Sequence, residues 1–166
     1  MSFYRRNLPH IQKDYSPHFI TFVTKHRFIL PDWAREVVLG CCIHGHETKY
    51  NIYAAVVMPD HVHLILTPLV DLKSYSMFPL HKILRSIKSY SARRINERLQ
   101  CGTVWQEESF DRVLRSSENL DAKIAYVVEN PVRKGLVSVS EDYPWLWQKP
   151  VQRVDCGGPG GPPLRI

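Results

Sequence analysis

The most informative segment of this chain is YNIYAAVVMPDHVHLILTP, residues 50–68. Two apolar runs, about residues 50–58 and 61–67, flank the dipeptide Pro59-Asp60. Proline presets the backbone for the first central position of a tight turn, so the stretch predicts a β-hairpin. Because side chains alternate between the two faces of a strand, His61 and His63 share one face while Val62 and Leu64 point to the other.

The segments on either side of the hairpin predict an α+β fold. We expect strands at 19–24 and around 110–115, and helices at 32–45, 80–99 and 118–130. The helix at 80–99 has an apolar stripe at helical spacing, and Pro131 is expected to end the last helix because the residue before proline resists helical dihedrals. This order predicts a ferredoxin-like β-α-β-β-α-β sandwich with an antiparallel sheet, its helices on one face, plus a C-terminal helix that carries Tyr126.

Composition and charge predict one basic globular domain. The chain has 166 residues, which we divide into a domain at 1–149 and a disordered Gly/Pro-rich tail at 150–166. Its net charge of +6 and pI of about 9.2 favour a polyanionic partner such as nucleic acid, or less often an anionic membrane surface. The first residues lack the apolar core of a signal peptide and no apolar run approaches a membrane span, so we expect a cytoplasmic protein. The four cysteines form no C-x-x-C pair, which indicates structural thiols.

The histidine pair is a candidate metal site. Imidazole binds many first-row metals, and His61 and His63 lie one residue apart on one face of a strand. Two half-exposed histidines on the open face of a sheet would show the same spacing. The His-x-His pattern alone therefore does not decide between the two interpretations.

The last predicted helix carries two further candidates, Tyr126 and Asn130. They stand four residues apart and so share a helix face. A phenol can act as a covalent nucleophile, and an amide oxygen is a hard ligand that Mg²⁺ or Mn²⁺ accepts. Taken alone, however, a tyrosine on an amphipathic helix is typical of packing, and an asparagine before proline is typical of a helix cap.

Four blocks of sequence together resemble a known family. They are VVMPDHVHLILTP (56–68), KSYSARRIN (88–96), VWQEESFDRVLR (104–115) and IAYVVENPVRKGLV (124–137). Their order and spacing are similar to those of REP-associated tyrosine transposases, relatives of the IS200/IS605 Y1 transposases among the HUH nucleases. The resemblance covers roughly residues 3–147.

The resemblance implies a function and a role for each candidate residue. His61 and His63 match the metal ligands, Tyr126 matches the nucleophile, and Asn130 matches a third ligand that is often Gln in the Y1 enzymes. The metal would be Mg²⁺ or Mn²⁺. The implied activity is DNA transposition by a single-stranded DNA endonuclease and strand-transferase. It would act on imperfect hairpins of repetitive extragenic palindromes through a 5′-phosphotyrosine, as a monomer or a homodimer.

Binding of single-stranded DNA requires a basic track and stacking surfaces. The candidates for these contacts are Arg5, Arg6, Lys82, Arg85, Lys88, Arg93, Arg115 and Arg133, with Trp105 and Tyr4 as stacking residues. Trp105 fits the core equally well, and we assign Trp33, Trp145 and Trp147 to packing. Two alternatives stay open: a non-catalytic nucleic-acid-binding module of ferredoxin-like fold, and a metal-dependent phosphodiesterase in which water is the nucleophile.

Overall fold

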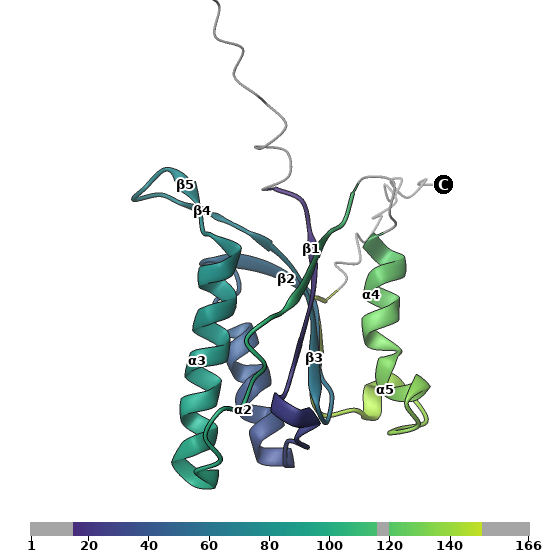
Figure 1. The fold of residues 1–166 in the computed structure, drawn as a ribbon. Helices are drawn as coiled ribbons and strands as arrows, with labels where there is room; N and C mark the ends of the chain where they lie inside the picture. The colour runs from purple at the N-terminus through teal and green to yellow at the C-terminus, as the bar shows by residue number, and fades with distance from the viewer. Residues whose placement is uncertain (1–14, 116–119, 151–166) are drawn as a thin grey trace, which may run out of the picture.

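A computed structural model describes residues 15–115 and 120–150. Their main elements are β1 (His18–Val23), α2 (Asp32–Ile43), β2 (Tyr50–Val57), β3 (His61–Pro68), α3 (Leu80–Leu99), β6 (Phe110–Val113), α4 (Leu120–Val128), α5 (Asn130–Arg133) and β7 (Leu146–Gln148). The sheet has the order β6-β1-β3-β2-β7, and all four pairings are antiparallel. Helices α2 and α3 cover one face, whereas α4 and α5 lie on the other (Figure 1). The α+β class with an antiparallel sheet is therefore confirmed.

The predicted hairpin is present, and its register sets which side chains share a face. The backbone N–H of Met58 donates to the carbonyl of His61 at 2.8 Å, which closes the turn at Pro59-Asp60. The pairing of β2 with β3 shifts between Ile52 and Ala54, which leaves Tyr53 as an extra residue in a β-bulge. Beyond the bulge, the alternation of β2 is displaced by one residue.

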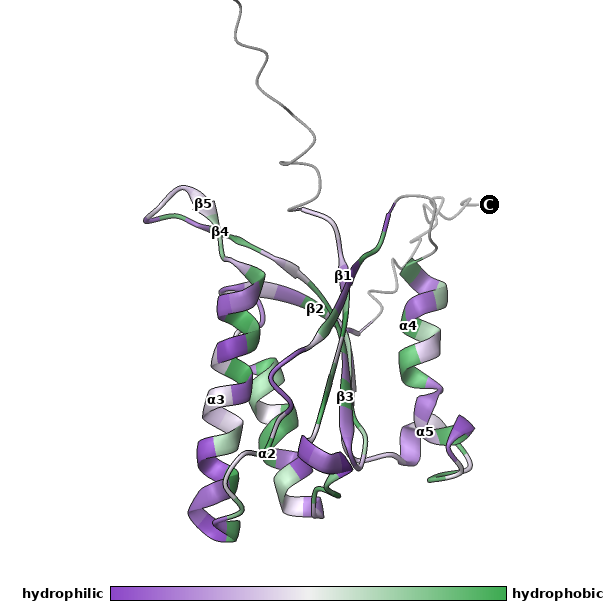
Figure 2. Ribbon diagram, viewed as in Figure 1, coloured by the Kyte–Doolittle hydropathy of each residue, from purple (hydrophilic) through white to green (hydrophobic). Residues whose placement is uncertain are grey.

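The sheet separates two hydrophobic cores. The larger core fills the space between the sheet and helices α2 and α3, and it contains the predicted inward set Val62, Leu64 and Leu66. The smaller core lies on the α4 side and includes Ile65 and Val127. Helices α3 and α4 each contain both hydrophobic and hydrophilic residues (Figure 2). Because helices cover both faces, the central strands are apolar on both sides.

The long helix α3 has its predicted bounds. Trp105, which follows α3 in the chain, is hydrogen-bonded back to that helix. The indole N–H donates to the Ser91 hydroxyl at 3.0 Å, and the tryptophan is only 5% exposed. Trp105 is therefore a core residue, and the prediction that it stacks on DNA is wrong. Lys88 is likewise engaged, since its ammonium donates to the carbonyls of Gln106 and Glu107 at 2.6 and 2.9 Å. Its predicted contact with a DNA phosphate stays a prediction.

The C-terminal elements depart from the sequence-based expectation. Helix α4 ends at Val128, and Pro131 lies in the first turn of the next short helix, α5, instead of ending a helix. Proline is favoured at a helix start because the missing N–H would have no partner there. Strand β7, which extends the sheet, was not predicted. Neither were the small elements η1 (Lys25–Arg27), β4 (Val70–Asp71), β5 (Ser76–Met77) and η2 (Ser140–Asp142).

Residues 1–14, 116–119 and 151–166 lie outside the described part, so the predicted contacts of Tyr4, Arg5 and Arg6 and the expected tail at 150–166 fall there apart from Pro150. None of the described helices is long and apolar enough to cross a membrane.

We expect Tyr50 to stabilise the turn between α2 and β2. Its buried hydroxyl donates to the carbonyl of Cys42 at 2.9 Å and accepts from the N–H of Gly45 at 3.2 Å. A Cβ at Gly45 would lie 2.4 Å from the Tyr50 ring, so only glycine allows this close approach. Tyr50→Phe should lower the free energy of unfolding by about 1–3 kcal/mol in urea denaturation, because two buried groups lose their partner. The exposed Tyr75→Phe should change it by less than about 0.5 kcal/mol, and equal effects of the two variants would contradict this role.

Candidate active site

The two histidines lie side by side on the α4 face of the sheet. His61 and His63 pair with Val23 and Thr21 of β1, and their ring centroids are 4.8 Å apart. His63 is only 8% exposed, whereas His61 is partly buried. The shared face predicted from the alternation of β3 is confirmed. The covering of that face by a helix excludes the alternative of two histidines on an open sheet.

Each imidazole is oriented by a hydrogen bond at its Nδ1 atom. The Nδ1 of His61 donates to the Asp60 carboxylate at 2.6 Å, and the Nδ1 of His63 is bonded to the Thr21 hydroxyl at 2.8 Å. Histidines that bind metals are commonly fixed in this way, because a partner at one ring nitrogen sets the tautomer and leaves the other nitrogen as the ligand. Both rings therefore present Nε2 as the atom that can bind a metal.

Asp60 connects the histidines to the turn η1. Its second carboxylate oxygen accepts a hydrogen bond from Arg27 at 3.2 Å. Arg27 and its neighbour His26 have φ angles of 57° and 53°, a left-handed conformation that is uncommon outside glycine. Partial burial raises the pKa of Asp60, but the hydrogen bond and charge of His61 and of Arg27 outweigh it, so the pKa lies below its usual value. Asp60 is accordingly an anion that can hold the His61 ring.

His63 is held in its neutral form. Burial lowers the pKa of His63 to about 4, and the positive charges of His61, Lys134 and Lys123 add to the shift. A metal binds only the neutral imidazole. The fold thus keeps His63 ready to act as a ligand at neutral pH.

Tyr126 lies next to the histidine pair. Its ring centroid is 5.9 Å from that of His63 and 6.1 Å from that of Phe19, both in edge contacts. The residue is nevertheless 36% exposed. Two cations flank the ring, with Lys123 Nζ at 5.3 Å and Arg133 Cζ at 5.1 Å from its centroid. The phenol is therefore partly open to solvent, beside the imidazoles and between positive charges.

Asn130 is the third predicted ligand. It lies one helical turn after Tyr126 at the start of α5, is 4% exposed, and its Oδ1 atom has no hydrogen-bond partner. A buried amide oxygen without a partner is costly, and a bound cation would satisfy it. The amide oxygen is a ligand of the kind that Mg²⁺ and Mn²⁺ accept, and the two imidazoles are ligands for first-row transition metals. Within residues 15–115 and 120–150, no group of three or more His, Cys, Asp and Glu residues could hold a metal.

The predicted DNA-binding residues fall into separate regions. Arg133 lies against Tyr126 at the candidate site, and Arg115 is exposed just after β6. The exposed Lys82, Arg85 and Arg93 belong to α3, which covers the opposite face of the sheet (Figure 1). The structure therefore does not join the α3 cations to the tyrosine in one track.

Several residues of the site were missed by the sequence analysis. Asp60 could have been found, because an acid directly before His61 in the turn is within reach of its ring. Thr21 contacts His63 only through the pairing of β1 with β3, and Lys123 is close only because α4 packs on the sheet. No local pattern signals these last two contacts.

Comparisons with known proteins find a family model and two relatives. The family model described as "Transposase IS200 like" matches residues 11–130. A Haemophilus influenzae protein named as a REP-associated tyrosine transposase is 24% identical over 102 residues, which are 58% of this chain and 57% of that protein. A solved structure of a REP-associated tyrosine transposase bound to a REP hairpin has a TM-score of 0.64 at 23% identity, covering 88% of this chain and 82% of the other. The chain thus spans little more than half of the curated relative, and the solved structure supports the fold alone.

The neutral state of His63 predicts how stability depends on pH in the absence of metal. The unfolded chain takes up a proton on this histidine near its ordinary pKa of about 6.5, whereas the folded chain does so only near 4. Between these values the unfolded state binds more protons, so stability falls as the pH falls. In the presence of a chelator, His63 should make the protein on the order of 2 kcal/mol less stable at pH 5 than at pH 8.

Urea denaturation at both pH values measures this difference. His63→Gln should remove that part of the pH dependence, whereas the exposed His26→Asn should keep it. An unchanged pH dependence in His63→Gln would show that His63 is not held neutral.

Proposed function

The chain belongs to the IS200-like transposase family, and on this premise we propose that it is a metal-dependent single-stranded DNA endonuclease and strand-transferase. The observation that carries the proposal is the contact of Tyr126 with His63, at 5.9 Å between ring centroids, on the covered face of the sheet. The curated relative named as a REP-associated tyrosine transposase, and the solved relative bound to a REP hairpin, support hairpin DNA as the substrate.

A divalent metal, Mg²⁺ or Mn²⁺, would be held by Nε2 of His61, Nε2 of His63 and Oδ1 of Asn130. When bound, it would supply Lewis-acid stabilisation of charge on the scissile phosphate. Asp60 and Thr21 keep the two rings oriented, and the low pKa of His63 keeps that ligand free of a competing proton. Three protein ligands leave positions for phosphate and water, as a catalytic site requires.

Tyr126 is the proposed nucleophile. Its phenol loses its proton, the Oη–P bond forms, and the P–O3′ bond breaks. The 3′-oxygen leaves and takes up a proton, while the phosphate stays on the 5′ end as a phosphotyrosine. A second 3′-hydroxyl can attack the same phosphorus and release Tyr126, which rejoins the strands. Lys123 and Arg133, which flank the ring, would hold the negative phosphate during both steps.

The residues of the proposed site all come from one chain. Helix α4 packs on its own sheet through Val127, which is fully buried in the smaller core. The same helix places Tyr126 beside His63 of that chain. A monomer is therefore sufficient for the proposed chemistry, and a homodimer would not have to exchange α4.

Formation of a covalent adduct tests the nucleophile. Wild-type protein with Mn²⁺ and a hairpin oligonucleotide labelled at its 3′ end should give a labelled band at the protein's position on a denaturing gel. Tyr126→Phe should abolish this band, because Tyr126 supplies the phenol of the proposed site. Tyr75→Phe, a change at an exposed tyrosine in the loop between β4 and β5, should preserve it. Cleavage by Tyr126→Phe without an adduct would identify water as the nucleophile, and no cleavage by wild type would favour the binding module.

Asn130 can be tested by metal binding rather than by activity. Asn130→Leu should weaken Mn²⁺ binding by about tenfold or more in calorimetry, because one ligand is lost. With a chelator present, the variant should be no less stable than wild type, because the buried Oδ1 has no partner to lose. Asn51→Leu, in β2, should bind Mn²⁺ normally. Unchanged affinity in Asn130→Leu would exclude Asn130 as a ligand.

A further inference from the structure

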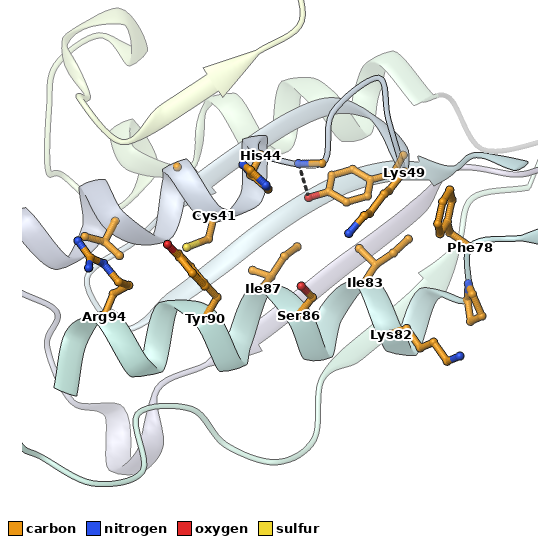
Figure 3. A pocket seen from close by; sticks show the side chains of 15 residues that line it. Cys41, His44, Lys49, Phe78, Lys82, Ile83, Ser86, Ile87, Tyr90 and Arg94 are labelled. Atoms are coloured by element: carbon orange, nitrogen blue, oxygen red, sulfur yellow. Dashed lines mark hydrogen bonds between the residues drawn. The ribbon is translucent and has the colours of Figure 1, made fainter. Parts of the chain in front are cut away.

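A groove of about 610 Å³ lies between α2 and α3, on the side of the sheet opposite Tyr126 (Figure 3). Its walls are apolar where the two helices approach each other, with Val37 from α2 and Ile83 and Ile87 from α3. Phe78 lines one end, just before α3 begins. Ile83 and Ile87 are each only 4% exposed, so the apolar floor of the groove is the outer edge of the larger core.

The charged residues of the groove all have one sign. Lys49 and Lys82 line one end and Arg94 the other, and none of the 15 lining residues is acidic (Figure 3). Arg94 pairs with Glu97 outside the groove at 3.0 Å, but both side chains are 50% exposed. Such surface pairs are weak, so Arg94 can still contribute its charge to a ligand. The groove is thus suited to an occupant with an apolar part and several negative charges.

An exposed aromatic ring adds a stacking surface. Tyr90 lines the groove and is 51% exposed, and Arg93 Cζ lies 5.1 Å from its ring centroid. A positively charged groove with aromatic side chains is the usual arrangement for binding single-stranded nucleic acid, in which bases stack and phosphates meet cations. On the premise of the proposed function, we propose that the α2–α3 groove binds a single-stranded segment of the DNA substrate, remote from the cleaved phosphate.

The dimensions of the groove suit more than one nucleotide. Lys82 and Arg94 are twelve residues apart on α3, which is about 18 Å along the helix axis. The cations at the two ends therefore meet different phosphates of one strand, with bases on the apolar wall between them. This position also gives a role to Lys82 and Arg93, which lie away from Tyr126.

Gly40 supports the view that the groove is kept open. It lies within α2 and lines the groove, and a Cβ at this position would meet no atom within 4 Å. Glycine inside a helix is less stable than alanine by roughly 0.5–1 kcal/mol. Nothing within the described protein requires glycine here on steric grounds. The missing side chain enlarges the groove instead, so Gly40 is the position at which the groove can be blocked without disturbing the fold.

Fluorescence anisotropy with a labelled oligothymidylate of about ten nucleotides tests the proposal, since single-strand sites span roughly 4–16 nucleotides. The parent protein is the full chain with Tyr126→Phe, which prevents covalent capture. Gly40→Glu in this parent should weaken binding by about tenfold or more, because it places a negative charge in the groove. Gly40→Ala should have at least the parent's free energy of unfolding in urea, which shows that the fold tolerates a side chain at this position.

The salt dependence identifies the phosphate contacts. Lys82→Gln should reduce the slope of log affinity against log salt by about 0.7, the value for one phosphate contact on a single strand. Lys149→Gln, which removes an equal charge just after β7, should leave affinity and slope unchanged. The proposal is wrong if Gly40→Glu and Lys82→Gln both bind like the parent. It is also wrong if the parent does not bind the oligothymidylate at all. Failure of the proposed function would show separately, as absence of the covalent adduct in wild type.

Discussion

The candidate site depends on the packing of α4 against the second face of the sheet. Val127 is buried among Phe19, Ile65 and the other residues of the smaller core, and this contact fixes the rotation of the helix. Tyr126, the preceding residue, is thereby turned toward the strand that carries His63. Burial of one valine side chain contributes about 1.5–3 kcal/mol, so hydrophobic packing helps to position the proposed nucleophile.

The electrostatics of the site combine two effects that usually oppose each other. Positive residues near a phosphate-binding site attract DNA, but they also disfavour any further positive charge. At His63 that second effect is useful, because Lys123 and Lys134 help to keep the imidazole neutral. His61 is instead bonded to the anionic Asp60, which is anchored by Arg27. The two histidines therefore differ in environment although they are neighbours on one strand.

Local patterns in the sequence predicted the fold class and the central hairpin, but not strand β7 or the whole site. The apolar alternation around Pro59-Asp60 determines the hairpin and the shared face of His61 and His63 without reference to the rest of the chain. The bond of Thr21 to His63 depends on the register of two strands 42 residues apart, which no local rule specifies. The expectation that Pro131 ends a helix was wrong because proline can either end a helix or begin one. Only the structure shows that it begins α5. Trp105 could be assigned to the core only after Ser91 was placed beside it.

Gly40 shows why a surface groove is harder to read from sequence than a buried core. Within residues 32–43 it is one weak position in a helical pattern, in which Val38 and Cys42 are buried in the core. The space at Gly40 forms part of a groove only because α3 packs beside α2. Helix α3 brings Tyr90 and its cations to the same groove. A core is encoded by side chains that are present and periodic. The groove instead depends on a side chain that is missing at Gly40, so it can be recognised only when the positions of both α2 and α3 are known.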